Sequence, residues 1–341
     1  MIIAPDNIHT RELFYRITAL WVICEAFAGG IMHGIKIPFS GLMVSSLAVF
    51  CIILLAWYIP SKTAIFKATL IVAIFKLMLS PHAPPTAYIA VFFQGLMGQL
   101  FLNKSYFGLS AIIVAVLSLV ESAIQRILVL VVLYGNDFWK AVNEFIAKVT
   151  GDKTINNYSL LLAGGYIFIH AIVGIFVGYY AAKLVTSSGR WKSELKNYII
   201  KDNTYNNEPL ITRPKKKKKK LKIIFLITWL LLLAFYLQSQ FDAANAFLPK
   251  DKVVQILVRS ALIIIAWYLF VSPLMTMLIK KALIKRQQNN KEDMNATMQL
   301  LPEIKMIFQQ SWQLSAAEKS FNRLKFFPVD FCFIDLRICN R

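Results

Sequence analysis

Long runs of apolar residues follow one another along almost the whole chain and limit what it can fold into. A helix needs roughly 20 apolar residues to cross the hydrocarbon core of a bilayer, which is about 30 Å thick. Such runs occur at residues 13–35, 40–59, 64–80, 86–103, 107–134, 159–183, 223–239 and 254–279. The third run is the weak one, because Lys67 and Lys76 interrupt it. The sequence therefore predicts an all-α, polytopic membrane bundle with about eight transmembrane helices.

The composition favours lipid over water as the solvent for these helices. Of the 341 residues, 57% are hydrophobic and 16% are charged, whereas soluble domains carry about a quarter charged residues. The net charge of +20 can also mark a nucleic-acid-binding protein. Here, however, the basic residues lie between apolar runs and in the tail, without the interleaved aromatics that would stack on bases. We expect a multi-pass protein of the cell membrane that contacts lipid and binds no nucleic acid.

The positions of the basic residues predict the orientation of the helices, because lysine and arginine concentrate in cytoplasmic loops. The segment 186–222 contains six consecutive lysines, Lys215 to Lys220, and further basic residues follow the last apolar run. Both segments are expected in the cytoplasm, separated by one helical hairpin. Counting back along the chain then places the N-terminus and the C-terminus inside. The connectors expected outside are 36–39, 81–85, 135–158 and 240–253.

The basic segment also divides the chain into four expected parts. These are a six-helix membrane module (1–185), a basic cytoplasmic linker (186–222), a two-helix membrane hairpin (223–280) and an amphipathic cytoplasmic tail (281–341). The tail predicts a helix over about 293–325, with Pro302 in its first turn. Such a helix can lie on the membrane surface or dock a cytoplasmic partner, and the sequence leaves both open. Its expected apolar face consists of Met298, Leu301, Ile304, Phe308 and Trp312.

Polar residues inside the apolar runs are candidates for a functional site, because an ionisable group in a bilayer costs roughly 2.5–3.5 kcal/mol on insertion scales. Glu25 lies midway along the first run, and Glu121 and Gln125 share one face of the fifth, being four residues apart. Two outer connectors each combine a histidine with proline, which makes stiff turns suited to a ligand site. The candidate solute-binding residues are Glu25, His33, His82, Gln94, Glu121 and Gln125. For each of them, a role in helix packing is the alternative.

Small residues recur every four positions in two of the runs, which lets helix backbones approach closely. They are Ala26, Gly30 and Gly34 in the first run and Gly174, Gly178 and Ala182 in the sixth. Packing inside the bundle is the simpler interpretation, and docking of a separate membrane subunit is the other.

The six-helix module resembles the substrate-binding S components of energy-coupling-factor (ECF) vitamin transporters. The resemblance rests on the small-residue face of the first helix and on the segments from His33 to Gly41 and from Ser80 to Gly95. It implies capture of a vitamin-like solute from outside, a transmembrane T component that meets Ala26, Gly30 and Gly34, and cytoplasmic ATPases. The tail is laid out like the coupling helices of T components but lacks their Ala-Arg-Gly motif.

The leading expectation is therefore binding and translocation of a small solute from outside, together with partner subunits. No Walker A loop, HExxH or GxSxG motif occurs, so we expect no enzyme, no cofactor and no metal. The cysteines show no metal-binding spacing and are expected as free thiols. Two other functions stay open: an intramembrane enzyme acting on a lipid or isoprenoid, and a non-catalytic membrane assembly subunit.

Overall fold

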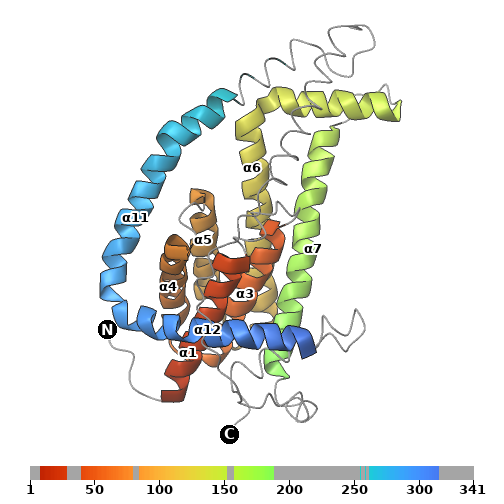
Figure 1. Cartoon of the computed structure of the whole chain (residues 1–341). Helices are drawn as coiled ribbons and strands as arrows, with labels where there is room; N and C mark the ends of the chain where they lie inside the picture. The colour runs from red at the N-terminus through yellow and green to blue at the C-terminus, as the bar shows by residue number, and fades with distance from the viewer. Residues whose placement is uncertain are drawn as a thin grey trace. The chain divides into compact units, whose positions relative to one another are not determined.

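The computed structural model describes residues 8–28, 40–79, 84–151, 157–187, 254, 258 and 261–314. Every regular element in these ranges is a helix, and they contain no strand (Figure 1). The all-α class is therefore confirmed for this part of the chain. The helices belong to two compact units. Unit 1 comprises 1–122, 170–208 and 277–341, and unit 2 comprises 123–169 and 209–276.

Among the described residues, four helices are long and apolar enough to cross a membrane, which supports the prediction of a membrane protein. All four match apolar runs from which spans were predicted, and they exceed the minimum of about 17 residues that the bilayer core requires. The four are Ser40–Tyr58 (α3), Phe107–Gly135 in the first part of α6, Tyr158–Thr186 (α7) and Ala261–Gln288, which includes α11 (Ser272–Asn289).

The other described runs form shorter helices. The first run holds α1 (Ile8–Val22), which continues into the π-helical turn η1 (Ile23–Ala28). Helices α4 (Ala64–Leu79) and α5 (Pro85–Phe101) have 16 and 17 residues, or about 24–26 Å at 1.5 Å per residue. The predicted run 223–239 and the predicted linker beyond residue 187 lie outside the described residues.

Helices α1, α3, α4 and α5 pack together in unit 1, and their contacts fix their directions. The side-chain amide of Gln99, near the end of α5, bonds to the backbone of Lys62 and Phe66 at the start of α4. At the other end of α4, Lys76 reaches the carbonyl of Ala87 at the start of α5. The two helices are therefore antiparallel. The core between the four helices includes the fully buried side chains of Trp21, Ile52, Leu54, Ile71 and Phe75.

Glycines allow two close helix contacts in unit 1. A Cβ atom at Gly95 of α5 would lie 2.1 Å from Thr69 Oγ1 of α4, so only glycine fits there. On α7, a Cβ at Gly178 would lie 2.5 Å from Ile112 Cα of α6, and one at Gly174 would lie 2.8 Å from Val116 Cα. The small-residue face predicted on the sixth run therefore packs inside the bundle, backbone against backbone, which confirms the simpler interpretation.

Helix α6 (Phe107–Thr150) has 44 residues and changes direction at Gly135. Gly135 has φ 70° and ψ −173°, a left-handed conformation that glycine adopts without the steric cost other residues incur. Most of the predicted outer connector 135–158 is thus helical. In unit 2, Asn143 in this second part of α6 accepts a 2.7 Å hydrogen bond at Oδ1 from the backbone N–H of Ser159, at the start of α7.

The predicted tail helix is present as α12 (Lys291–Leu314), as far as the described residues extend. The prediction for Pro302 is wrong, because Pro302 lies inside the helix and its first turn instead carries Glu292 and Asp293. Proline removes the hydrogen bond to the carbonyl four residues earlier, here that of Met298. The helix tolerates this loss because Pro302 and Met298 are both exposed, so water can bond to the carbonyl instead.

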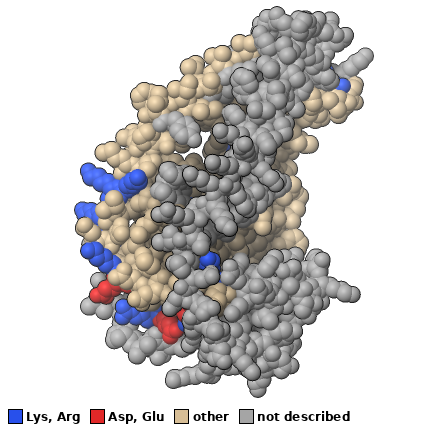
Figure 2. All heavy atoms as spheres, viewed as in Figure 1, with Lys and Arg blue, Asp and Glu red and all other residues tan. Residues whose placement is uncertain are grey.

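Charged side chains gather where α11 ends and α12 begins. Figure 2 shows blue and red atoms concentrated in one part of the visible face, while other residue types cover the rest of its described surface. Helix α11 changes from apolar to basic along its length, which is typical of a helix that leaves the membrane on the cytoplasmic side. Its exposed basic residues are Lys280, Lys281, Lys285 and Arg286.

Candidate functional site

Glu25 lies in the π-helical turn η1 and is 4% exposed. A π-helical turn attached to an α-helix is frequent at functional sites, because it changes the direction in which side chains point. In unit 1, η1 packs against α3 and α4. The carboxylate predicted as a site residue is thus held inside the bundle, where it requires a partner.

That partner is Lys76 of α4. Lys76 Nζ lies 2.6 Å from Glu25 Oε2 and donates a second hydrogen bond of 3.3 Å to the carbonyl oxygen of Ala87. Lys76 is itself buried, and the two formal charges cancel. Lys76 stands out in the sequence as a polar residue inside an apolar run, but it was not among the predicted solute-binding residues. The Glu25–Lys76 pair joins residues 51 positions apart, so no local pattern indicates it.

Buried polar atoms without a partner lie close in sequence to this pair. Within the described part of the chain, Trp21 Nε1 and Tyr88 Oη are buried and have no hydrogen-bond partner. Trp21 precedes Glu25 by one turn, and Tyr88 follows Ala87, which Lys76 contacts. A buried polar group without a partner costs about 1–3 kcal/mol. On residues close in sequence to the pair or its contacts, the bundle therefore holds hydrogen-bonding capacity that the described residues do not use.

Gln94 forms a second polar layer further along α5. Its Nε2 donates a 3.1 Å hydrogen bond to Ser45 Oγ of α3, while no described residue bonds to its Oε1. Gln94 follows Tyr88 by six residues, or about 9 Å along the helix axis. Gln94 is thus buried in the same bundle as Glu25 but one layer away from the ion pair.

Two contacts show the relative direction of α1 and α4 and how far along them the pair lies. Lys67 Nζ of α4 is 5.8 Å from the ring centroid of Phe14 of α1, and Lys76 meets Glu25 further along both helices. Helices α1 and α4 therefore run parallel. Nine residues separate Lys67 from Lys76, which places the pair about 14 Å along the helix axis from Lys67.

The remaining predicted site residues are distributed as follows. Glu121 and Gln125 lie one turn apart on α6, both partly exposed, with Glu121 in unit 1 and Gln125 in unit 2. Ala26 belongs to η1. His33, His82, Gly30 and Gly34 lie outside the described residues.

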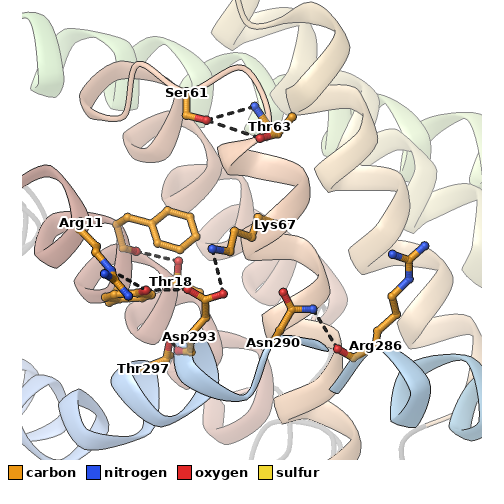
Figure 3. Close-up of polar contacts among 11 residues, drawn as sticks. Arg11, Thr18, Ser61, Thr63, Lys67, Arg286, Asn290, Asp293 and Thr297 are labelled. Atoms are coloured by element: carbon orange, nitrogen blue, oxygen red, sulfur yellow. Dashed lines mark hydrogen bonds and ion pairs between the residues drawn. The ribbon is translucent and has the colours of Figure 1, made fainter. Parts of the chain in front are cut away.

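A second polar cluster attaches α12 to α1 and α4, and Figure 3 shows the part of it around Asp293. Asp293 Oδ1 accepts a 2.6 Å hydrogen bond from Tyr15 Oη, and Asp293 Oδ2 lies 2.8 Å from Lys67 Nζ. Further along α12, Glu303 Oε1 lies 3.1 Å from Arg16 Nη2. Arg11 Nε donates to Tyr15 Oη, and this hydrogen bond raises the pKa of Arg11. The acidic face of α12 thus binds the basic end of α1 and α4.

The apolar face of α12 supports the same contact. Leu301 and Ile304 are buried, as predicted, together with Thr297. Met298 belongs to the same apolar series, and its side chain is 42% exposed. The side chains of Phe308 and Trp312 lie outside the description. Helix α12 therefore covers α1 of its own chain. The sequence had left open a membrane surface or a cytoplasmic partner for this helix.

Metal and thiol chemistry find little support in the described residues. No group of three or more His, Cys, Asp or Glu side chains in those ranges could hold a metal ion. Cys24 and Cys51 are buried and form no disulfide, and Cys332 and Cys339 lie beyond the description. The buried Glu25–Lys76 pair, which links η1 to α4, is the candidate site.

No protein-family model matches the chain, and no curated protein or solved structure matches it either. The Glu25–Lys76 pair and the directions of the helices around it are therefore the basis for assigning a function.

Proposed function

We propose that the chain is a multi-pass protein of the cell membrane that binds a small solute from outside and moves it across the bilayer. The observation that carries this proposal is the buried Glu25–Lys76 pair. Trp21 and Tyr88, which lie close in sequence to residues of the pair or its contacts, carry buried polar atoms to which no described residue bonds. A buried ion pair is seldom the best way to stabilise a bundle, because well-packed apolar residues do as well or better. Ionisable groups inside membrane proteins commonly mark the path of a substrate or ion.

The proposed topology has eight spans and both termini in the cytoplasm. It is supported by the parallel course of α1 and α4, by the antiparallel α5, and by the basic end of α11. Lys62 and Lys104 then lie in inner connectors, as the positive-inside rule favours. The Glu25–Lys76 pair falls in the outer half of the bundle, toward the connectors that contain His33 and His82. These two histidines would meet the solute as it enters.

The proposal includes the four-part organisation of the chain and its partners. The six-helix module (1–185) would bind the solute, with the linker 186–222, the hairpin 223–280 and the tail 281–341 following it. By the resemblance to S components, a transmembrane T component would dock on Ala26, Gly30 and Gly34, and cytoplasmic ATPases would drive release. Copurification of such subunits with the tagged full chain is the direct check on this part.

A ligand screen on the purified full chain tests the solute-binding proposal. Water-soluble vitamins, amino acids and nucleosides are added one at a time, and the melting temperature is measured. We expect at least one compound to raise the melting temperature of the wild type and to have no effect on Glu25→Gln. Glu292→Gln, which changes an exposed acidic residue of α12, is the matched control and should respond like the wild type. A compound that stabilises Glu25→Gln as well would remove Glu25 from the site.

A further inference from the structure

We infer that the solute bound at the Glu25–Lys76 pair is a small zwitterion, with a cationic group for Glu25 and an anionic group for Lys76. This inference rests on the proposed function, since it assigns the chemical class of the solute. Three features of the site support this inference. They are its net charge, its hydrogen-bonding groups, and the change of partners that Glu25 and Lys76 undergo when a solute comes between them.

The charge of the site limits the charge of its solute. Glu25 and Lys76 are 4% and 7% exposed and lie 2.6 Å apart, so the buried site is neutral as a whole. A solute with a net charge would bring an uncompensated charge into this buried site, which costs several kcal/mol. Solutes without a net charge are therefore favoured.

The hydrogen-bonding groups fit a solute with one anionic and one cationic end. A lysine ammonium has three donors, and the described contacts of Lys76 use two, to Glu25 and Ala87. Trp21 Nε1 can only donate and Tyr88 Oη can donate or accept, and no described residue bonds to either. The remaining Lys76 donor suits a carboxylate, and Trp21 and Tyr88 carry further unused polar atoms on residues close in sequence to the pair or its contacts. The Glu25 carboxylate and the Ala87 carbonyl are acceptors, and they suit an ammonium group.

A zwitterion is favoured over an uncharged polar solute because Glu25 and Lys76 must change partners when a solute binds. Glu25 and Lys76 are in direct contact, so a solute that binds both must come between them. An uncharged solute would then leave two buried charges without counter-charges. A zwitterion gives Glu25 a cation and Lys76 an anion, so each charge keeps an opposite partner throughout. Charge-assisted hydrogen bonds of this kind are roughly twice as strong as neutral ones.

Matched triplets of amino-acid derivatives test the inference on the purified full chain in nanodiscs of neutral lipid. Each triplet contains the free amino acid, its cationic amide and its anionic N-acetyl derivative, and glycine betaine is added as a further zwitterion. The melting temperature is measured against concentration at pH 7. We expect at least one zwitterion to bind, with both charged derivatives at least about tenfold weaker. Binding of no zwitterion, or equal binding of a charged derivative, would overturn the inference.

Variants of the pair should change this charge preference in opposite directions. Lys76→Met leaves Glu25 alone and should favour the cationic amide, whereas Glu25→Gln leaves Lys76 alone and should favour the N-acetyl derivative. Should either variant fail to fold, the double variant Glu25→Lys, Lys76→Glu keeps the site neutral and should still prefer the zwitterion. An unchanged charge preference in a folded single variant, or loss of the zwitterion preference in the double variant, would contradict the inference.

The two proposals can fail separately. If the broader screen finds an uncharged or singly charged solute whose binding requires Glu25, the proposed function stands and the zwitterion inference is wrong. If no compound in either experiment binds, both are wrong.

Discussion

Glu25 and Lys76 depend on each other, because each would be a buried charge without its partner. Removing one member of a buried ion pair typically costs about 3–5 kcal/mol, whereas replacing both with groups of similar volume is often close to neutral. We expect Lys76→Met or Glu25→Gln to lower the free energy of unfolding by this amount. The double variant Glu25→Gln, Lys76→Met should recover most of it.

Denaturant unfolding of the four proteins in one detergent measures this coupling as a double-mutant cycle. Lys62→Met is a suitable control, since this lysine is exposed and only its backbone carbonyl is bonded. If the two single effects simply add in the double variant, Glu25 and Lys76 do not form the proposed pair.

At the residue scale, the sequence predicted part of the site. Glu25 and Gln94 were recognised because polar groups stand out within apolar runs. Lys76 was missed as a site residue because its role depends on α1 and α4 lying side by side. Trp21 and Tyr88 gave no signal, since a polar tip on an aromatic side chain is common in apolar helices.

At the element scale, the contact between α6 and α7 depends on glycine at specific positions. Gly178→Ala would place a methyl group 2.5 Å from Ile112 Cα, and overpacking of this kind costs about 1–3 kcal/mol or more. Gly165→Ala on the same helix meets nothing within 4 Å and should stabilise the helix by up to about 1 kcal/mol. Melting temperatures of the two variants should therefore shift in opposite directions. A similar shift for both would mean that α7 does not approach α6 at Gly178.

The attachment of α12 to α1 and α4 should weaken when Asp293 loses its charge. Asp293→Asn removes the ion pair with Lys67 and weakens the bond from Tyr15, and hydrogen bonds to charged groups contribute about 1.5–3 kcal/mol. We expect faster amide hydrogen exchange along α12 in this variant, with little change in α3. Glu292→Gln, next to it and exposed, should leave exchange unchanged. Equal exchange in Asp293→Asn and the wild type would show that Asp293 does not hold α12 in place.

The tail illustrates what apolar spacing can and cannot predict about an element. The spacing predicted a helix and two of its buried residues, Leu301 and Ile304. It could not predict which surface the helix covers, because Tyr15, Arg16 and Lys67 lie more than 200 positions away. Met298, the first member of the apolar series, is exposed rather than buried. The buried face instead includes Thr297, whose hydroxyl donates to the carbonyl of Asp293.

At the scale of the whole molecule, hydrophobic run length predicted the helical class and the four candidate spans. It was less informative for α4 and α5, whose lengths lie at the lower limit for crossing a bilayer. Direction along the bundle came from the structure, through contacts such as Lys76 with Ala87. Which end faces the cytoplasm still rests on the distribution of lysine and arginine.

Thiol labelling from each side of the membrane tests the central claim most directly. With the four native cysteines replaced by alanine, Ser105→Cys and Asn157→Cys place single thiols at exposed positions before α6 and α7. A membrane-impermeant maleimide should label Asn157→Cys on intact cells, and Ser105→Cys only after the membrane is opened. This result would put the Glu25–Lys76 pair in the outer half of the bundle, where a solute can reach it. Labelling of both positions from the same side would contradict the account.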